Sequence, residues 1–218
     1  MQLMNERQRF PFVVVCIVAA IVIGIAFLTT HFVDPAPAVA NKTYWYLERS
    51  AGFTSYGLLS LAVLLGASSS SAFWDKWNMR KLMTQMHQYA SLLVLPFLFF
   101  HLWGLHMDKS IPFHIPQLLI PFISSYRAIP TGLGVLTLYA WALLIISSYF
   151  REKIGLNTWR TIHFLSFPMF IAVTFHGLLS GTDSSKHWAT LVYAIPSGLF
   201  VIFLAMRMRK RKTVPVQR

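Results

Sequence analysis

The sequence predicts an all-α membrane protein, a bundle of six transmembrane helices, and three observations lead to this fold class. Hydrophobic residues make up 56% of the 218 residues, whereas Asp, Glu, Lys and Arg make up only 12%, about half the share of a soluble domain. Mean hydropathy is +0.55. Several apolar segments exceed about 18 residues, the length that a helix needs to cross a bilayer. The single cysteine, Cys16, argues against a disulfide framework or a thiolate metal cluster.

The first predicted span covers residues 11–33. This apolar run could be read as a signal peptide, but it is longer than the apolar region of one, so we expect an uncleaved helix. Pro35 and Pro37 then fall in a predicted polar loop over residues 34–48.

Five further spans follow, with one long connection among them. That connection, residues 108–130, contains an apolar stretch over residues 115–123 that is too short to span and is expected to lie on the membrane surface or to re-enter it. The chain is thus a cytoplasmic N-terminus (1–10), a helical domain (11–206) and a basic tail (207–218). The remaining spans are predicted over residues 49–73, 81–107, 131–150, 161–180 and 188–206.

The connections alternate in positive charge, which predicts their orientation. The N-terminus, the connections over residues 74–81 and 151–160, and the tail hold 14 of the 19 Lys and Arg residues. By the positive-inside rule, both termini then lie in the cytoplasm, and the protein is a multi-pass protein of the cell membrane, the inner membrane in bacteria. The net charge of +12 is mainly this topology signal, so we expect no nucleic-acid binding. The tail is expected to contact anionic membrane lipid, and docking an acidic protein is a second use.

Two histidine pairs lie inside predicted spans, where an ionisable residue indicates a functional site. His87 and His101 are fourteen positions apart on the third span, and His163 and His176 are thirteen positions apart on the fifth. Each separation corresponds to about 20 Å along a helix. Because both spans run outward, depth pairs His87 with His163 (the inner pair) and His101 with His176 (the outer pair).

Imidazole pairs at matched depth predict two hemes b, each held by two histidines as axial ligands of the iron. Bis-histidine ligation fills both axial positions, so it favours electron transfer over oxygen binding. The alternative is that these histidines are interhelical hydrogen-bonding groups. A fourteen-position step returns to within about 40° of the same helix face, but a thirteen-position step misses it by about 140°. The fifth span is therefore expected to be distorted between its histidines, with Pro168 as the cause, and Pro96 lies likewise between the histidines of the third span.

Basic and aromatic residues flank the predicted heme sites. Arg49 opens the second span on the outer side, where it either binds a heme propionate or is a boundary arginine extending to the interface. Arg80, Lys81 and Arg160 could bind propionates on the inner side. Trp159 is expected to anchor the interface and to pack near the inner heme. Other histidines are read as interfacial rather than as a metal or substrate site: His31, His106, His114 and His187.

The four-histidine layout resembles the ferric reductase-like transmembrane domain, which ferric reductases and NADPH oxidases share. That domain carries histidine pairs with the same two separations, fourteen and thirteen positions, on its third and fifth spans. The sequence from Trp159 to His163, WRTIH, is similar to its W-R-x-x-H signature, and Arg49 to Gly52 is similar to its R-x-x-G entry to the second span. The run from Arg80 to His87 looks like the basic lead-in to its first ligand. The resemblance covers about residues 45–206.

The resemblance implies heme b and transmembrane electron transfer, as an oxidoreductase component. A separate cytoplasmic flavoprotein reductase or a quinol would be the donor, so FMN, FAD or a quinone would act through a partner. This follows because the chain has no G-x-G-x-x-G after a strand and no segment able to form a flavin or nicotinamide domain. The outer acceptor would be ferric iron or a periplasmic redox protein, and a quinone or oxygen also stays open.

Three alternatives stay open on the sequence. The chain also looks like stand-alone bacterial members of the family, such as the heme subunit that supplies a periplasmic methionine sulfoxide reductase. It could instead be a heme-carrying assembly or anchor subunit without turnover of its own. A third possibility is a proton-coupled transporter with the histidines as a relay, which the position of all seven acidic residues in or beside predicted loops disfavours.

Overall fold

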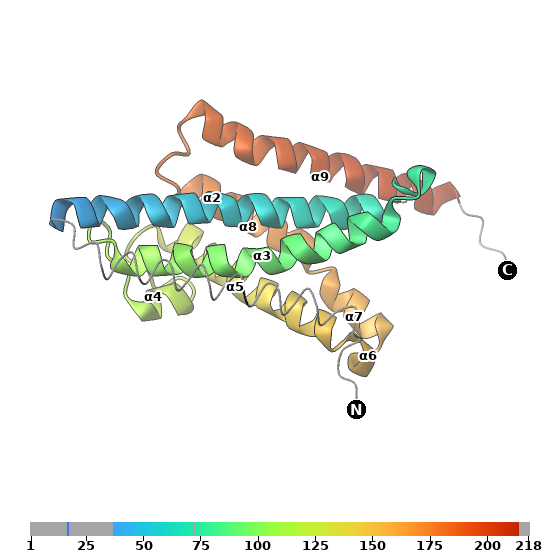
Figure 1. The fold of residues 1–218 in the computed structure, drawn as a ribbon, viewed down its shortest axis with the longest axis horizontal. Coiled ribbons are helices and arrows are strands. Elements are labelled where there is room, and N and C mark those ends of the chain that lie inside the picture. Colours follow the sequence, from blue (N-terminus) through green and yellow to red (C-terminus); the bar gives the residue numbers. More distant parts are fainter. Residues whose placement is uncertain (1–16, 18–36, 72, 214–218) are drawn as a thin grey trace.

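A computed structural model describes residues 17, 37–71 and 73–213 (Figure 1). The predicted first span, residues 11–33, lies outside the described residues apart from residue 17. Every regular element in the described ranges is a helix. In chain order they are α2 (Pro37–Ser70), the 3-10 turn η1 (Asp75–Trp77), α3 (Arg80–Met107), α4 (Ile115–Leu119), α5 (Ala128–Tyr149), α6 (Arg151–Ile154), α7 (Leu156–His163), α8 (Ser166–Ser180) and α9 (His187–Thr213).

Five of the described segments are long and apolar enough to cross a membrane, which makes the chain a multi-pass membrane protein. They correspond to the second to sixth predicted spans, and α7 and α8 together form one of them. Their bounds are Lys42–Ser70, Arg80–Met107, Ala128–Tyr149, Leu156–Ser180 and His187–Met208. In Figure 1, α2 and α3 run side by side, and α9 lies along the opposite side of α2.

The predicted loop over residues 34–48 is wrong from Pro37 onward, because α2 begins there, twelve residues before the predicted start. Proline tolerates the first turn of a helix, where its missing N–H has no intrahelical partner. Glu48 accordingly lies inside a helix rather than beside one. The last span, predicted over residues 188–206, corresponds to His187–Met208, and its helix α9 continues beyond the span to Thr213. Lys and Arg are good helix formers and interact favourably with a helix C-terminus.

The apolar stretch after α3 forms a short helix, α4, at the end of the bundle where α2 begins (Figure 1). The Tyr139 hydroxyl of α5 donates a hydrogen bond to the Leu119 carbonyl at 2.6 Å. This connection is therefore packed against the side of α5.

The hydrophobic core lies midway along the bundle. Phe170 of α8 and Val94 of α3 are 1% and 2% exposed, and they pack in one cluster with Tyr56 of α2, Leu144 of α5 and Phe200 of α9. The core thus joins all five described spans between the two levels at which the histidines lie.

Candidate functional site

The structure brings the four predicted histidines together in two pairs. The ring centroids of His87 and His163 are 6.1 Å apart, with an angle of 71° between the rings. Those of His101 and His176 are 6.5 Å apart, at 78°. These are the inner and outer pairs that helix direction and depth predict. Each pair joins α3 to the span formed by α7 and α8.

A break in the fifth span lets both of its histidines face α3. α7 ends at His163, and α8 begins at Ser166. Pro168 has no N–H to donate to the Phe164 carbonyl, which instead accepts a hydrogen bond from the Phe167 N–H at 3.2 Å. This local rearrangement is the distortion that the thirteen-position step requires. By contrast, α3 continues without interruption through Pro96, as its fourteen-position step allows.

Three of the four imidazoles are held from behind by a backbone carbonyl of a neighbouring helix. An Nδ1–H that donates to a carbonyl fixes the tautomer and leaves the Nε2 lone pair available, the usual arrangement of a histidine that binds a metal. The acceptors are Ala62 for His87 (2.7 Å), Glu48 for His101 (2.7 Å) and Pro130 for His176 (2.9 Å).

Each of these carbonyls belongs to a residue that has a glycine four positions later in the same helix: Gly66, Gly52 and Gly134 respectively. A Cβ at Gly134 would lie 2.6 Å from His176, at Gly52 2.9 Å from His101, and at Gly66 3.3 Å from His87. The glycines therefore make the room in which the imidazoles approach the carbonyls. We call each carbonyl residue with its glycine a carbonyl–glycine unit.

Sequence reasoning missed these units, although a signal was present. Gly52 and Gly66 are fourteen positions apart on α2, the same step that separates the two histidines of α3. A close contact between α2 and α3 completes the arrangement, since a Cβ at Gly104 would lie 2.8 Å from the Cβ of Glu48.

A cavity of about 950 Å³ contains the inner pair. Its wall includes four arginines, from α3, α6, α7 and α9: Arg80, Arg151, Arg160 and Arg207. Arg80 and Arg160 were predicted at this position, Arg151 and Arg207 were not, and Lys81 is not part of the wall. The cavity thus combines two imidazoles with guanidinium groups able to bind carboxylates bidentately.

Trp159, predicted to anchor the interface and to lie near the inner heme, packs on His163 of the inner pair. Its ring centroid lies 5.0 Å from that of His163, with 32° between the rings. The indole Nε1–H donates a hydrogen bond to the Ser148 hydroxyl of α5 at 3.2 Å.

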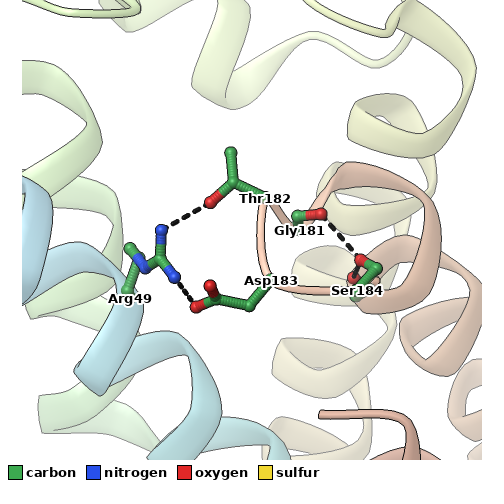
Figure 2. Close-up of polar contacts among 6 residues, drawn as sticks. Arg49, Gly181, Thr182, Asp183 and Ser184 are labelled. Carbon is green, nitrogen blue, oxygen red and sulfur yellow. Dashed lines mark hydrogen bonds and ion pairs between the residues drawn. The ribbon is translucent and has the colours of Figure 1, made fainter. Parts of the chain in front are cut away.

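Arg49 lies at the end of the bundle that contains the outer pair and joins α2 to the turn that follows α8. Figure 2 shows its guanidinium paired with the Asp183 carboxylate and donating to the Thr182 hydroxyl at 2.6 Å. The same guanidinium lies 3.9 Å from the centroid of the Trp45 ring. Arg49 is adjacent to Glu48, whose carbonyl holds His101. The contacts of Arg49 therefore join α2, which holds His101, to the turn after α8, the helix that carries His176.

The remaining histidines stay apart. The His106 Nδ1 hydrogen bonds with the Phe113 carbonyl at 3.0 Å, and His114 and His187 are exposed. Within residues 37–71 and 73–213, no three His, Cys, Asp or Glu side chains gather in a way that could hold a metal ion. His31 lies outside the described residues.

A comparison with protein families finds a match to the ferric reductase like transmembrane component, over residues 51–174. The matched segment is more than half of the chain. It contains His87, His101 and His163 and ends two residues before His176. Neither the curated proteins nor the solved structures provided a match.

Proposed function

Because the chain belongs to the ferric reductase-like family of transmembrane components, and is therefore a membrane redox component, we propose that it is a heme b-containing electron-transfer protein. It carries electrons from a donor on the cytoplasmic side to an acceptor on the outer side. The observation that carries the proposal is the separation of the two histidine pairs, 6.1 and 6.5 Å between ring centroids.

This separation fits two imidazoles with a metal ion between them. A metal–nitrogen bond of about 2 Å, and about 1 Å from each nitrogen to its ring centre, put two coaxial ring centroids about 6 Å apart. A direct hydrogen bond of about 3 Å between ring nitrogens would bring the centroids to about 5 Å. The observed centroid distances, 6.1 and 6.5 Å, both exceed the value for a direct hydrogen bond. They therefore favour a metal ion between the two histidines over a hydrogen bond between them.

We assign His87 and His163 to the iron of an inner heme, and His101 and His176 to the iron of an outer heme. Heme iron supplies reversible one-electron chemistry, which bis-histidine ligation reserves for electron transfer. The inner cavity fits such a group, because its two imidazoles lie opposite each other and its arginines could bind the propionates. Arg80 and Arg160 are the first candidates for that role.

Arg49 is our candidate for an outer propionate. The guanidinium offers five N–H donors in a planar fork. The contacts in Figure 2 use one donor of Nη1 and one of Nη2. A propionate would therefore share the group with Asp183 rather than replace it.

The electron donor and acceptor are part of the same proposal. We propose a separate flavoprotein reductase or a quinol as the donor, with FMN, FAD or a quinone belonging to that partner. The outer acceptor is ferric iron or a periplasmic redox protein.

The histidines suit a proton relay less well. A relay histidine must exchange protons at both ring nitrogens, but Nδ1 of His87, His101 and His176 is engaged by a fixed backbone carbonyl. The buried Glu48 Oε2, which has no hydrogen-bond partner among the described residues, is the one feature that favours the transporter. Glu48 nevertheless contacts His101 through its backbone carbonyl, which holds the imidazole in place.

The experiment that tests the proposal is a heme count on the purified protein. A dithionite-reduced minus oxidised spectrum and a pyridine hemochrome assay should give two b hemes per chain. Replacing any one of the four histidines by alanine should leave one heme, and the exposed His114→Ala variant should keep two.

Two other outcomes would change the assignment. One heme that does not depend on His87 would favour the type that supplies a periplasmic reductase through one cofactor. A protein without heme after expression with heme supplied would overturn the proposal and bring the transporter forward.

A further inference from the structure

One imidazole of the inner pair lacks the carbonyl that holds the other three. The Nδ1 of His163 is buried and has no hydrogen-bond partner among the described residues. It is the only one of the four ligands we propose for which this holds, and its ring is held instead by the Trp159 indole.

The spacing of the carbonyl–glycine units shows where the missing carbonyl would be expected. On α2, the units Glu48/Gly52 and Ala62/Gly66 are fourteen positions apart and serve the two histidines of α3. On α5, the unit Pro130/Gly134 serves His176. The same step along α5 leads from this unit to Leu144 and Ser148. Serine thus stands at the position that has glycine in the other three units.

The Leu144 carbonyl is already occupied. The Ser148 hydroxyl donates to it at 2.7 Å, and the Ser147 hydroxyl donates to it at 3.1 Å. Ser148 also accepts the hydrogen bond from Trp159. Leu144, Ser148 and His163 all line the inner cavity, so these two residues of α5 border the site whose imidazole lacks a partner.

We propose that Ser148 is a positioning residue that withholds the Leu144 carbonyl from His163 and so tunes the inner heme site. This inference rests on the proposed function, because it concerns ligand strength at heme iron. A hydrogen bond from Nδ1–H to a carbonyl makes imidazole a stronger donor, and a stronger donor stabilises the ferric state. With one such bond instead of two, the inner iron has a higher reduction potential than a complete set of carbonyls would give.

A purely structural role for Ser148 is the competing explanation. Serine in an apolar helix commonly donates to the carbonyl four residues earlier, which satisfies its hydroxyl. That role predicts no effect on the potential of a nearby heme, so a potential measurement separates the two explanations.

The test is a spectroelectrochemical titration of the Ser148→Gly protein with both hemes bound. The inner heme should shift to a lower midpoint potential, and we expect its ferrous-to-ferric equilibrium to change about tenfold. For a one-electron couple, this is 59 mV. The outer heme should not move. His87→Ala, which keeps only the outer heme, identifies the two transitions.

Two variants complete the design. Ser147→Gly also introduces a glycine into α5 and removes one hydroxyl from the same carbonyl, but it leaves Ser148 and Trp159 in contact, so it should not shift either potential. Ser148→Ala removes the Ser148 hydroxyl from the Leu144 carbonyl but keeps the Cβ, and the longer contact from the Ser147 hydroxyl remains. It should shift the inner heme in the same direction by less, and it decides the question where the glycine variant does not fold.

The outcomes are distinguishable from failure of the proposed function. Two hemes with an unchanged inner potential in both Ser148 variants would overturn this inference and leave electron transfer intact. A shift of equal size in Ser147→Gly would overturn it as well, because the effect would then come from α5 as a whole. A wild-type protein without heme would overturn the function itself.

Discussion

At the scale of single residues, the site depends as much on glycines as on histidines. A glycine inside a helix costs about 1 kcal/mol relative to alanine, and α2 and α5 place one opposite three of the four imidazoles. The clearest comparison is within α2. Gly52 is in contact with His101, whereas a Cβ at Gly57 would meet nothing within 4 Å.

We predict that alanine at Gly52 or Gly134, the glycines next to the outer pair, weakens binding of the outer heme and leaves binding of the inner heme unchanged. In Gly134→Ala, the new Cβ would lie 2.6 Å from the His176 ring, so the imidazole must move away from the Pro130 carbonyl. Loss of such a partner reduces affinity by about 10-fold to 100-fold. The measurement is heme content and the rate of heme loss to an acceptor protein.

The control for this prediction is Gly57→Ala, which should retain both hemes. Gly66→Ala should have the mildest effect among the unit glycines, because its Cβ would lie 3.3 Å from His87. Equal heme loss in Gly57→Ala and Gly134→Ala would show that helix stability, rather than room for the imidazole, is what these glycines provide.

Residue-scale features divide clearly into those that the sequence predicts and those that it does not. The histidines can be paired because side-chain identity and spacing carry the information. Their carbonyl partners cannot be predicted in the same way, because every residue has a carbonyl and only the helix packing decides which one is near. The contact of Arg49 with Thr182 likewise joins residues 133 positions apart, for which a single sequence gives no signal.

At the scale of elements, the break between α7 and α8 determines whether both proposed ligands face α3. Pro168→Ala would restore an N–H that can donate to the Phe164 carbonyl, and an interior proline disfavours a straight helix by about 3 kcal/mol. In a straight helix, His163 and His176 would point about 140° apart. We predict that this variant keeps the outer heme and loses the inner one, as measured by the pyridine hemochrome count.

A matched control is Pro196→Ala in α9, a helix that also contains a proline but none of the proposed ligands. This variant should hold two hemes. If Pro168→Ala instead holds both hemes with unchanged spectra, the break is maintained by contacts other than the missing N–H.

The need for this distortion could be predicted from the thirteen-position step, but its position at Phe164–Leu165 could not. It depends on which carbonyl loses its donor and on how the neighbouring turn rearranges. The early start of α2 was missed for another reason. Pro37 was interpreted as a loop residue, although proline also suits the first turn of a helix, and only the downstream packing distinguishes the two.

At the scale of the whole molecule, the predicted orientation can be tested at two exposed lysines. Lys153 of α6 lies in a connection predicted to be cytoplasmic, and Lys186 lies in one predicted to be outside. We expect a membrane-impermeant maleimide to label Lys186→Cys in intact cells, but Lys153→Cys only after lysis, each in a Cys16→Ser background. The physical reason is that basic connections remain on the cytoplasmic side.

The reverse labelling pattern would invert the bundle and place the arginine-lined cavity on the outer side. The direction of electron flow would then need to be reversed. Labelling of both sites in intact cells would contradict a span between them, although Leu156–Ser180 is long and apolar enough to be one.

The short helix α7 has a consequence for how the protein matures. It is eight residues long, it follows Gly155 with a φ of 82°, and the break after His163 separates it from α8. His163, one of the two ligands that we propose for the inner heme, is therefore carried on a segment with a bend at each end, whereas His87, His101 and His176 lie within uninterrupted helices. Assembly is accordingly expected to run in order, with the outer cofactor seated first in a preformed site and α7 docking last to close the inner one.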